Sequence, residues 1–281
     1  MELPPGAEAI SLLGVNYARL KTQDCGDLYL THFGVPLRED LAPENWYAPD
    51  WFARRRIRLE GTSTIYRLPS RPVRGHSLDL VVRFSRLGQE IPLGTQFLSD
   101  NVHAEFNSPF EEFALAMALR ESHRGTSRPR MFTKKPLAIY VPATRLQDWQ
   151  TGRLESKMAA KRARHPEVKL EKSRLYILLY GWIDGLNAVQ AAHALGMSGT
   201  ATRKFLRDIT LRVIHDLASH GFRVLDIKPE HVVVRVRPDS SLLRRPSGDL
   251  AYALVDYELL ERLEKRSGQS QPNKPNLSCV P

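Results

Sequence analysis

The sequence predicts an α+β protein with two lobes: an antiparallel sheet that carries one helix, followed by a shortened and mostly helical lobe. Two observations support this fold class. Between residues 55 and 180 lie several short strand-like segments, the first with alternating apolar and polar residues, and one further segment has helical features. After Gly185 the pattern changes to helices that are followed by a short hairpin.

The composition is that of a soluble globular protein, with 42% apolar and 26% charged residues in a chain of 281. No apolar run approaches the roughly 18 residues that a membrane-spanning helix needs, and the N-terminus lacks the basic segment of a secretory signal. The two cysteines, Cys25 and Cys279, are too few and too far apart for a disulfide framework or a zinc site. We therefore expect a cytoplasmic protein without a membrane span.

Residues 1–54 are predicted to form an N-terminal extension that packs on the first lobe. They contain a helix-like segment at residues 8–20, a strand-like segment at residues 26–34 and a connector rich in proline and tryptophan. The tryptophans Trp46, Trp51 and Trp182 are expected to be packing residues.

The first lobe, residues 55–180, is predicted to contain five strands. Residues 54–70 predict two antiparallel strands with a turn at Gly61, and residues 77–86 predict a third. Two more strands are expected at residues 135–145 and 174–183.

The helix of the first lobe is expected at residues 108–122. Ser108 suits the N-cap position, Pro109 suits the first helical position, and Glu111 and Glu112 lie in the first turn, where the helix dipole favours acids.

A basic insertion at residues 150–174 separates the last two strands of this lobe. Between Arg153 and Arg174, eight Lys and Arg stand against three Glu. We expect an exposed basic helix or a mobile insertion. Its simplest role is a solvated face, and contact with nucleic acid is the alternative.

The second lobe is assigned to residues 181–265. A short helix at residues 187–195 ends at Gly196, a long helix at residues 200–222 ends at Gly221, and strands follow at residues 231–236 and 250–258. The apolar stripe of the long helix consists of Phe205, Leu206, Ile209, Val213, Ile214 and Leu217. Residues 266–281 are expected to be a disordered tail.

The segment LASHGFRVLDIKPEHVVVRV, from Leu217 to Val236, has features that a simple turn does not need. Asp226 and Lys228 lie two residues apart, Pro229 follows, and the chain then enters a run of valines. Gly, Asn and Ser would serve a turn better. A carboxylate and an ammonium at this spacing indicate a chemical role.

This segment resembles the catalytic loop of the protein-kinase-like superfamily, in which a His-Arg-Asp-Leu-Lys-Pro-Glu-Asn sequence runs into an apolar strand. The resemblance places Asp226 on the catalytic aspartate, Lys228 on the loop lysine and His231 on the metal-binding asparagine. The segment LVDYELL is similar to the Asp-Phe-Gly segment, which places Asp256 on the magnesium-binding aspartate.

Within the first lobe, LVVRFSR resembles the strand that carries the nucleotide-contacting lysine. Arg83 stands at that position, and Glu111 or Glu112 falls where a helix glutamate pairs with the cation. A purely structural ion pair is the alternative role for Arg83.

Two further segments are similar to nucleotide-binding parts of the family. Residues 180–185, YGWIDG, resemble the hinge that holds adenine through backbone hydrogen bonds, which implicates Tyr180 and Trp182. Gly61, Thr62 and Ser63 stand in the place of the glycine-rich phosphate loop, although only one glycine is present.

The resemblance implies a phosphotransferase that uses ATP and Mg²⁺ or Mn²⁺. The shortness of the chain after Asp256 is similar to compact bacterial sugar and lipopolysaccharide kinases. The acceptor would be a hydroxyl on a sugar, a glycolipid or a protein, and the net charge of +10 favours an anionic acceptor.

Three departures from the family pattern support an alternative. Arginine replaces lysine at Arg83, a nitrogen ligand replaces an amide oxygen at His231, and Glu258 replaces the glycine after the aspartate. These changes suit a pseudokinase that binds nucleotide or partners without catalysis. Asp226 and Asp256 could also be turn residues, and His231 a hydrogen-bonded loop residue.

Overall fold

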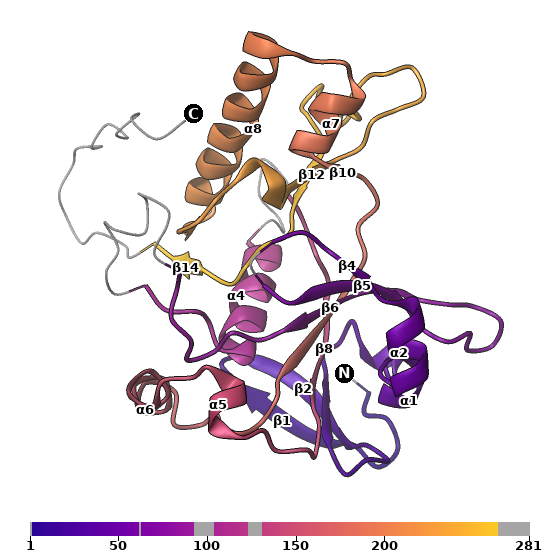
Figure 1. The fold of residues 1–281 in the computed structure, drawn as a ribbon, viewed down its shortest axis with the longest axis vertical. Coiled ribbons are helices and arrows are strands. Elements are labelled where there is room, and N and C mark those ends of the chain that lie inside the picture. Colours follow the sequence, from indigo (N-terminus) through magenta and orange to yellow (C-terminus); the bar gives the residue numbers. More distant parts are fainter. Residues whose placement is uncertain (1, 62, 93–103, 123–130, 264–281) are drawn as a thin grey trace. The chain divides into compact units, whose positions relative to one another are not determined.

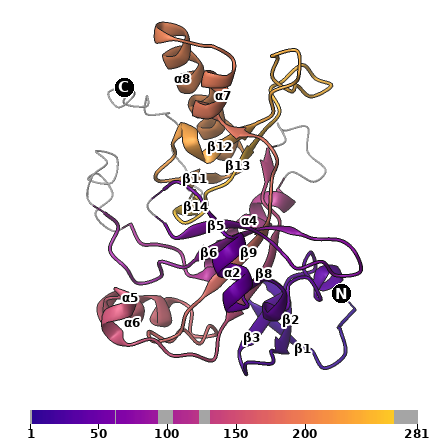
Figure 2. The ribbon, with the colours of Figure 1, turned by 45° about the vertical axis from the view of Figure 1, so that its right-hand side comes forward.

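The protein contains both α-helices and β-strands and divides into two compact units (Figures 1 and 2). The computed structural model describes residues 2–61, 63–92, 104–122 and 131–263. Within these, the first unit contains the chain up to Ile91, Glu105–Met117 and Lys134–Trp182, and the second contains the remainder. The predicted α+β class is confirmed.

The first unit is built on an antiparallel sheet of eight strands in the order β1-β2-β3-β8-β9-β6-β5-β4. The strands are β1 (Glu8–Leu12), β2 (Val15–Lys21), β3 (Asp27–Leu30), β4 (Ile57–Arg58), β5 (Ile65–Pro69), β6 (Asp79–Phe84), β8 (Pro136–Val141) and β9 (Ile177–Gly181). The strands predicted between residues 26 and 183 are confirmed. The N-terminal residues contribute to the same sheet, because β3 pairs with β8.

The helix predicted at residues 8–20 is wrong, because this segment is a β-hairpin. β1 and β2 pair with Leu12 opposite Val15, so that Leu13 and Gly14 form the turn. Both turn residues have positive φ, 52° and 77°, as a two-residue type I′ turn requires. The burial of Val15 and Tyr17 follows the period of a strand.

Two short helices, α1 (Pro43–Trp46) and α2 (Pro49–Arg55), form in the segment predicted as a connector. Each begins with proline at its first position, where the missing N–H costs nothing. Trp46 is fully buried, and its Nε1 donates to the carbonyl oxygen of Leu41 at 2.9 Å, which confirms its packing role. Figure 2 shows α2 in front of the sheet.

The main hydrophobic cluster joins these helices to the sheet. Its buried members are Ala18, Leu28, Leu30, Leu41, Trp46, Phe52, Leu68, Leu80, Val82, Leu137, Ala138, Tyr140, Ile177 and Leu179.

The other helices of the first unit are α4 (Pro109–Glu121), α5 (Asp148–Thr151) and α6 (Glu155–Arg164). The predicted start of α4 is confirmed. The backbone N–H of Ser108 donates to Glu111 Oε2 at 2.6 Å, and the N–H of Glu111 donates to Ser108 Oγ at 3.2 Å, which is a capping box. The last residues of α4 belong to the second unit.

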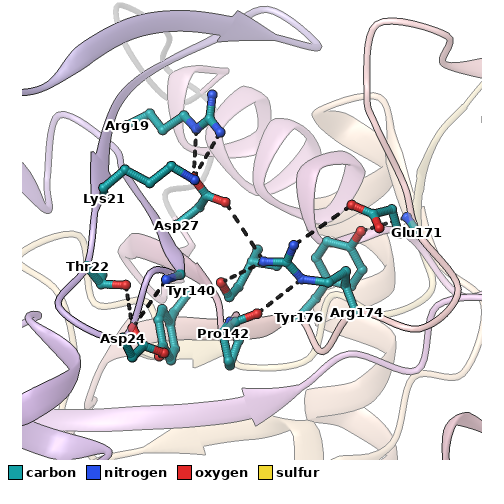
Figure 3. A network of polar contacts seen from close by, with 12 residues as sticks. Arg19, Lys21, Thr22, Asp24, Asp27, Tyr140, Pro142, Glu171, Arg174 and Tyr176 are labelled. Atoms are coloured by element: carbon teal, nitrogen blue, oxygen red, sulfur yellow. Dashed lines mark hydrogen bonds and ion pairs between the residues drawn. The ribbon is translucent and has the colours of Figure 1, made fainter. Parts of the chain in front are cut away.

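A polar network braces the N-terminal strands of the sheet (Figure 3). The buried carboxylate of Asp27 accepts a hydrogen bond from Arg19 Nε at 3.0 Å and lies 2.7 Å from Lys21 Nζ. Arg174 lies 3.9 Å from the second oxygen of Asp27 and donates to the carbonyl oxygen of Pro142 at 3.1 Å. Three cations therefore surround one carboxylate in a structural role.

In its described residues, the second unit contains two small sheets, the helices α7 and α8, and the end of α4. One sheet has the order β10-β12-β13-β7, and the other pairs β11 with β14. The elements are β7 (Phe132–Thr133), β10 (Leu186–Asn187), α7 (Ala188–Ala194), α8 (Gly199–Ser219), β11 (Phe222–Val224), β12 (Val232–Val234), β13 (Tyr252–Leu254) and β14 (Leu260–Arg262). The predicted helices and hairpin are confirmed, whereas β11 and β14 were not expected.

The inward face of α8 differs from the predicted apolar stripe. Ile209, Val213 and Leu217 are buried as expected, but Ile214 is 44% exposed. The inward position is taken instead by Asp216, which is buried and accepts a hydrogen bond from the hydroxyl of Tyr252. Asp216 also lies 3.4 Å from His215 Nδ1 and 4.0 Å from Arg212 Nε, and a buried acid of this kind leaves no signal in an apolar pattern.

None of the helices that the structure describes is long and apolar enough to cross a membrane. Three predictions lie outside the described residues: the tail at residues 266–281, Cys279 within it, and the phosphate contact of Thr62.

Candidate active site

The loop that follows β11 holds Asp226 and Lys228 as an ion pair. Lys228 Nζ donates to Asp226 Oδ2 at 2.7 Å. Pro229 then begins a 3₁₀ turn that ends at His231 and leads into β12. Because proline fixes its own φ, the path of the chain after the ion pair is restricted.

Two strand pairings bring this loop beside the segment that carries Asp256. β11 pairs with β14, and β12 pairs with β13, so residues 225–231 and 255–259 connect the same two ladders. The N–H of Val255 donates to the carbonyl oxygen of His231 at 3.0 Å, and His231 Nε2 lies 3.5 Å from Asp256 Oδ2. Two carboxylates that are thirty residues apart in the chain thus lie on neighbouring segments of one unit.

Four polar side chains on these two segments are partly exposed. The exposed side-chain fractions are 24% for Asp226, 40% for Lys228, 19% for His231 and 30% for Asp256. Glu258 is buried, and its backbone N–H donates to Asp256 Oδ1 at 3.1 Å. The four partly exposed side chains are therefore accessible to a ligand. The backbone N–H of Glu258 orients the Asp256 carboxylate.

Asp256 and His231 offer one oxygen and one nitrogen to a cation. In the described part of the chain, no group of three or more His, Cys, Asp or Glu side chains is placed to hold a metal ion. A metal here would need the oxygens of a bound phosphate and of water, which is the usual environment of Mg²⁺ beside nucleotides. The imidazole nitrogen of His231 is a poorer ligand for Mg²⁺ than an oxygen would be.

In the first unit, Arg83 is buried and paired with Glu112 of α4. Arg83 is 3% exposed, and its guanidinium forms an ion pair with the Glu112 carboxylate. The hydroxyl of Tyr180 donates to the other oxygen of that carboxylate, and Lys134 Nζ lies 4.3 Å from the centre of the Tyr180 ring. The pairing of Arg83 with a helix glutamate is present, and Glu112 is the partner.

Glu111 serves a different contact. Its carboxylate lies 2.9 Å from Lys161 Nζ and 2.8 Å from His165 Nε2. Burial alone would raise the pKa of Glu111, but the charge of Lys161 and the hydrogen bonds from Lys161 and Ser108 outweigh it and lower that pKa. Lys161 is itself buried, so this pair fixes α6 against the start of α4.

The loop between β4 and β5 exposes Gly61, which has a φ of +133°. Ser63 is buried, and its hydroxyl lies 3.5 Å from Arg86 Nη1. The two residues predicted to contact phosphate therefore differ in accessibility. Gly61 is exposed, whereas Ser63 faces the interior of the first unit.

Residues 180–185, the predicted hinge, make some of their backbone hydrogen bonds to other parts of the first unit. The side chain of Tyr180 is buried, and the N–H of Trp182 donates to the carbonyl oxygen of Asp79 at 3.0 Å. Arg67 stacks on the Trp182 ring, 4.5 Å from its centre, which supports packing for Trp182. The chain passes into the second unit at Ile183.

The basic segment 153–174 contains α6 and is part of the first unit. Most of its cations already have contacts within the protein. Arg153 donates to the carbonyl oxygens of Lys172 and Arg174, and ion pairs join Lys161 to Glu111, Arg162 to Glu155, Arg164 to Glu105 and Lys172 to Asp148. These contacts reduce the charge that the segment can offer to a nucleic acid.

Sequence reasoning missed Lys134, which is buried against Tyr180. It also missed the strand pairing that brings Asp226 and Asp256 onto neighbouring segments. For Lys134, the sequence signal is the adjacent pair Lys134–Lys135 before an apolar strand. Strands of three residues, such as β11 and β14, are too short to give a signal for their pairing.

No protein-family model matches the chain, and no curated protein was found to match it.

Proposed function

We propose that the protein is an atypical kinase-like phosphotransferase that moves the γ-phosphate of ATP to a hydroxyl acceptor. The observation that carries the proposal is the arrangement in the second unit, where Asp226, Lys228, His231 and Asp256 lie on two neighbouring segments and remain partly exposed. The Arg83–Glu112 ion pair in the first unit adds support, since an ion pair of this kind accompanies the active state of kinases.

The residues divide the chemistry as follows. Asp226 takes the proton from the hydroxyl of the acceptor substrate. At the same time the oxygen of that hydroxyl forms a bond to the γ-phosphorus. The bond from that phosphorus to the bridging oxygen breaks, and ADP leaves with the electron pair. Lys228 leaves Asp226 to balance charge on the transferred group. A Mg²⁺ or Mn²⁺ ion at Asp256 and His231 would neutralise phosphate charge.

The nucleotide contacts predicted for the first unit remain predictions: Arg83, Glu111, Glu112, Gly61, Ser63, Tyr180 and Trp182. The structure favours Gly61 among the loop residues because it is exposed. The net charge of +10 continues to favour an anionic sugar, glycolipid or protein acceptor.

The test compares ATP binding with ATP turnover. In a thermal-shift titration, ATP with Mg²⁺ or Mn²⁺ should raise the Tm of the wild type, and ADP should form at a measurable rate. Asp226→Asn should keep the shift while ADP formation falls by at least about 100-fold. Asp256→Asn should lose the metal-dependent part of the shift.

Asp239→Asn is the matched control, since Asp239 is an exposed aspartate in a turn of the same unit. Its shift and ADP formation should equal those of the wild type. The absence of an ATP shift with either metal, or an Asp226→Asn variant as active as the wild type, would contradict the proposal.

A pseudokinase is the second candidate, and the interior position of Arg83 favours it. A guanidinium that is 3% exposed and ion-paired with Glu112 has a structural function without any nucleotide. Under this alternative, ATP shifts the Tm but no Asp226-dependent ADP forms. His231→Asn would then be expected to restore part of the metal dependence.

A further inference from the structure

Five exposed arginines gather on the face of the first unit formed by α2, β4 and β5. We call them the arginine surface: Arg54, Arg55, Arg56, Arg58 and Arg71. Among the described residues, the neighbouring Arg67 and Arg74 form ion pairs with Asp79 and Glu39, whereas none of these five has a carboxylate partner. With the nearby acids Asp50 and Glu60, the surface keeps a net charge of +3.

Aromatic rings fix the positions of four of these arginines. The guanidinium carbons of Arg55 and Arg71 lie 5.0 and 5.7 Å from the centre of the Trp51 ring. Trp51 is held in turn, because its Nε1 donates to the carbonyl oxygen of Pro69 at 2.9 Å.

The second ring is Tyr66 of β5. The guanidinium carbons of Arg56 and Arg58 lie 5.1 and 5.4 Å from its centre, and Arg58 is directly opposite Tyr66 in the β4–β5 ladder. When a guanidinium stacks on an aromatic ring, its N–H donors lie in the guanidinium plane and remain free to bind a ligand beside the ring. The contacts with the rings restrict these side chains before any ligand binds, so binding costs less conformational entropy.

We propose that the arginine surface binds the phosphate backbone of single-stranded nucleic acid. Guanidinium groups bind phosphate oxygens in pairs. Arg56 and Arg58 are two residues apart on an extended segment, and therefore about 7 Å apart on one face. Two guanidinium groups at this separation on one face suit a linear polyanion, and single-strand sites combine positive charge with aromatic residues and arginine.

Two other kinds of partner fit the surface less well. A membrane would need apolar side chains among the arginines, but Ile57, which is 59% exposed, points to the opposite face of β4 from Arg56 and Arg58. An acidic peptide that extends the sheet would need a longer edge, because β4 has only two residues.

The experiment measures the binding of a fluorescent oligouridylate and a fluorescent oligothymidylate by anisotropy at several salt concentrations. The test variant replaces Arg55, Arg56, Arg58 and Arg71 with Gln. The control variant removes the same charge from the basic segment by replacing Lys157, Arg162, Arg164 and Lys169 with Gln. The full-length protein is used throughout, and thermal unfolding checks that each variant folds.

The wild type should bind with an affinity that falls steeply with salt. The test variant should lose at least about tenfold in affinity, and its slope of log K against log salt should fall by about 3 units. The control variant should stay within about threefold of the wild type. If the test variant does not fold, replacement of the same arginines with Lys should retain the salt slope while lowering affinity severalfold.

Equal losses in the test and control variants would overturn the proposal, since they would show a response to net charge alone. Equally tight, arginine-dependent binding of phosphatidylglycerol vesicles or of polyglutamate would overturn the assignment to nucleic acid. None of these readouts depends on ATP turnover, so the result stands apart from the kinase proposal.

Discussion

At the residue scale, Gly34 is a position where no side chain fits. A Cβ there would lie 2.1 Å from the carbonyl oxygen of Leu137 and 3.3 Å from Leu30 Cδ2. Because the nearest obstacle is backbone of the central strand β8, it cannot turn aside. Gly34→Ala should lower the free energy of unfolding by about 2 kcal/mol, measured by urea denaturation.

Gly181→Ala is the matched control for this prediction. Gly181 lies in the same unit, and nothing is within 4 Å of the position that its Cβ would take. We expect a change below about 0.5 kcal/mol. Equal stability losses at the two glycines would show that the steric argument at Gly34 is wrong.

At the element scale, the docking of α6 on α4 depends on the charge of Glu111. Its pKa is lowered in the folded state, so the ionised form contributes stability above the ordinary pKa of about 4.3. That contribution is lost as the pH falls through the lower, folded pKa. Glu111→Gln leaves Lys161 buried without its main partner and should cost about 3 kcal/mol at pH 7.

The measurement is urea denaturation of the wild type and Glu111→Gln from neutral pH down to pH values below the ordinary pKa of glutamate. The difference between them should be constant at neutral pH and shrink in acid. Lys161, His165 and Glu105 are the ionisable groups near this carboxylate, and all are kept in both proteins. Glu167→Gln, at an exposed glutamate of the same segment, should match the wild type at every pH. A difference that persists undiminished in acid would contradict the role of charge.

The elements that the sequence predicted correctly are those with local signals. α4 has its capping box at Ser108 and Glu111, and β6 and β9 contain short continuous apolar runs, as buried strands do. The hairpin of β1 and β2 was mistaken for a helix because its turn, Leu13–Gly14, lacks the usual Asn-Gly or Asp-Gly pair. Local chemistry therefore decided which predictions succeeded.

At the scale of the whole molecule, the sequence indicated candidate site residues but could not predict which of them lie on neighbouring segments. Asp226 and Asp256 were singled out, but the pairing of β11 with β14 that makes their segments neighbours is a long-range contact between three-residue strands. Arg83 was given two possible partners, and only packing decides that Glu112 pairs with it while Glu111 faces Lys161.

The net charge of +10 predicts how the stability of the whole molecule responds to salt. Like charges repel more strongly in the compact state than in the unfolded chain. At 0.1 M, salt largely screens the repulsion between exposed charges that are more than about 10 Å apart. The Tm measured by differential scanning fluorimetry should therefore rise by a few degrees between about 20 and about 200 mM NaCl. Replacing Arg55, Arg56, Arg58 and Arg71 with Gln lowers the net charge by four and should flatten this rise. A Tm that falls with salt would mean that the attractive pairs, such as Arg145 with Glu171 and Lys172 with Asp148, outweigh the excess of positive charge.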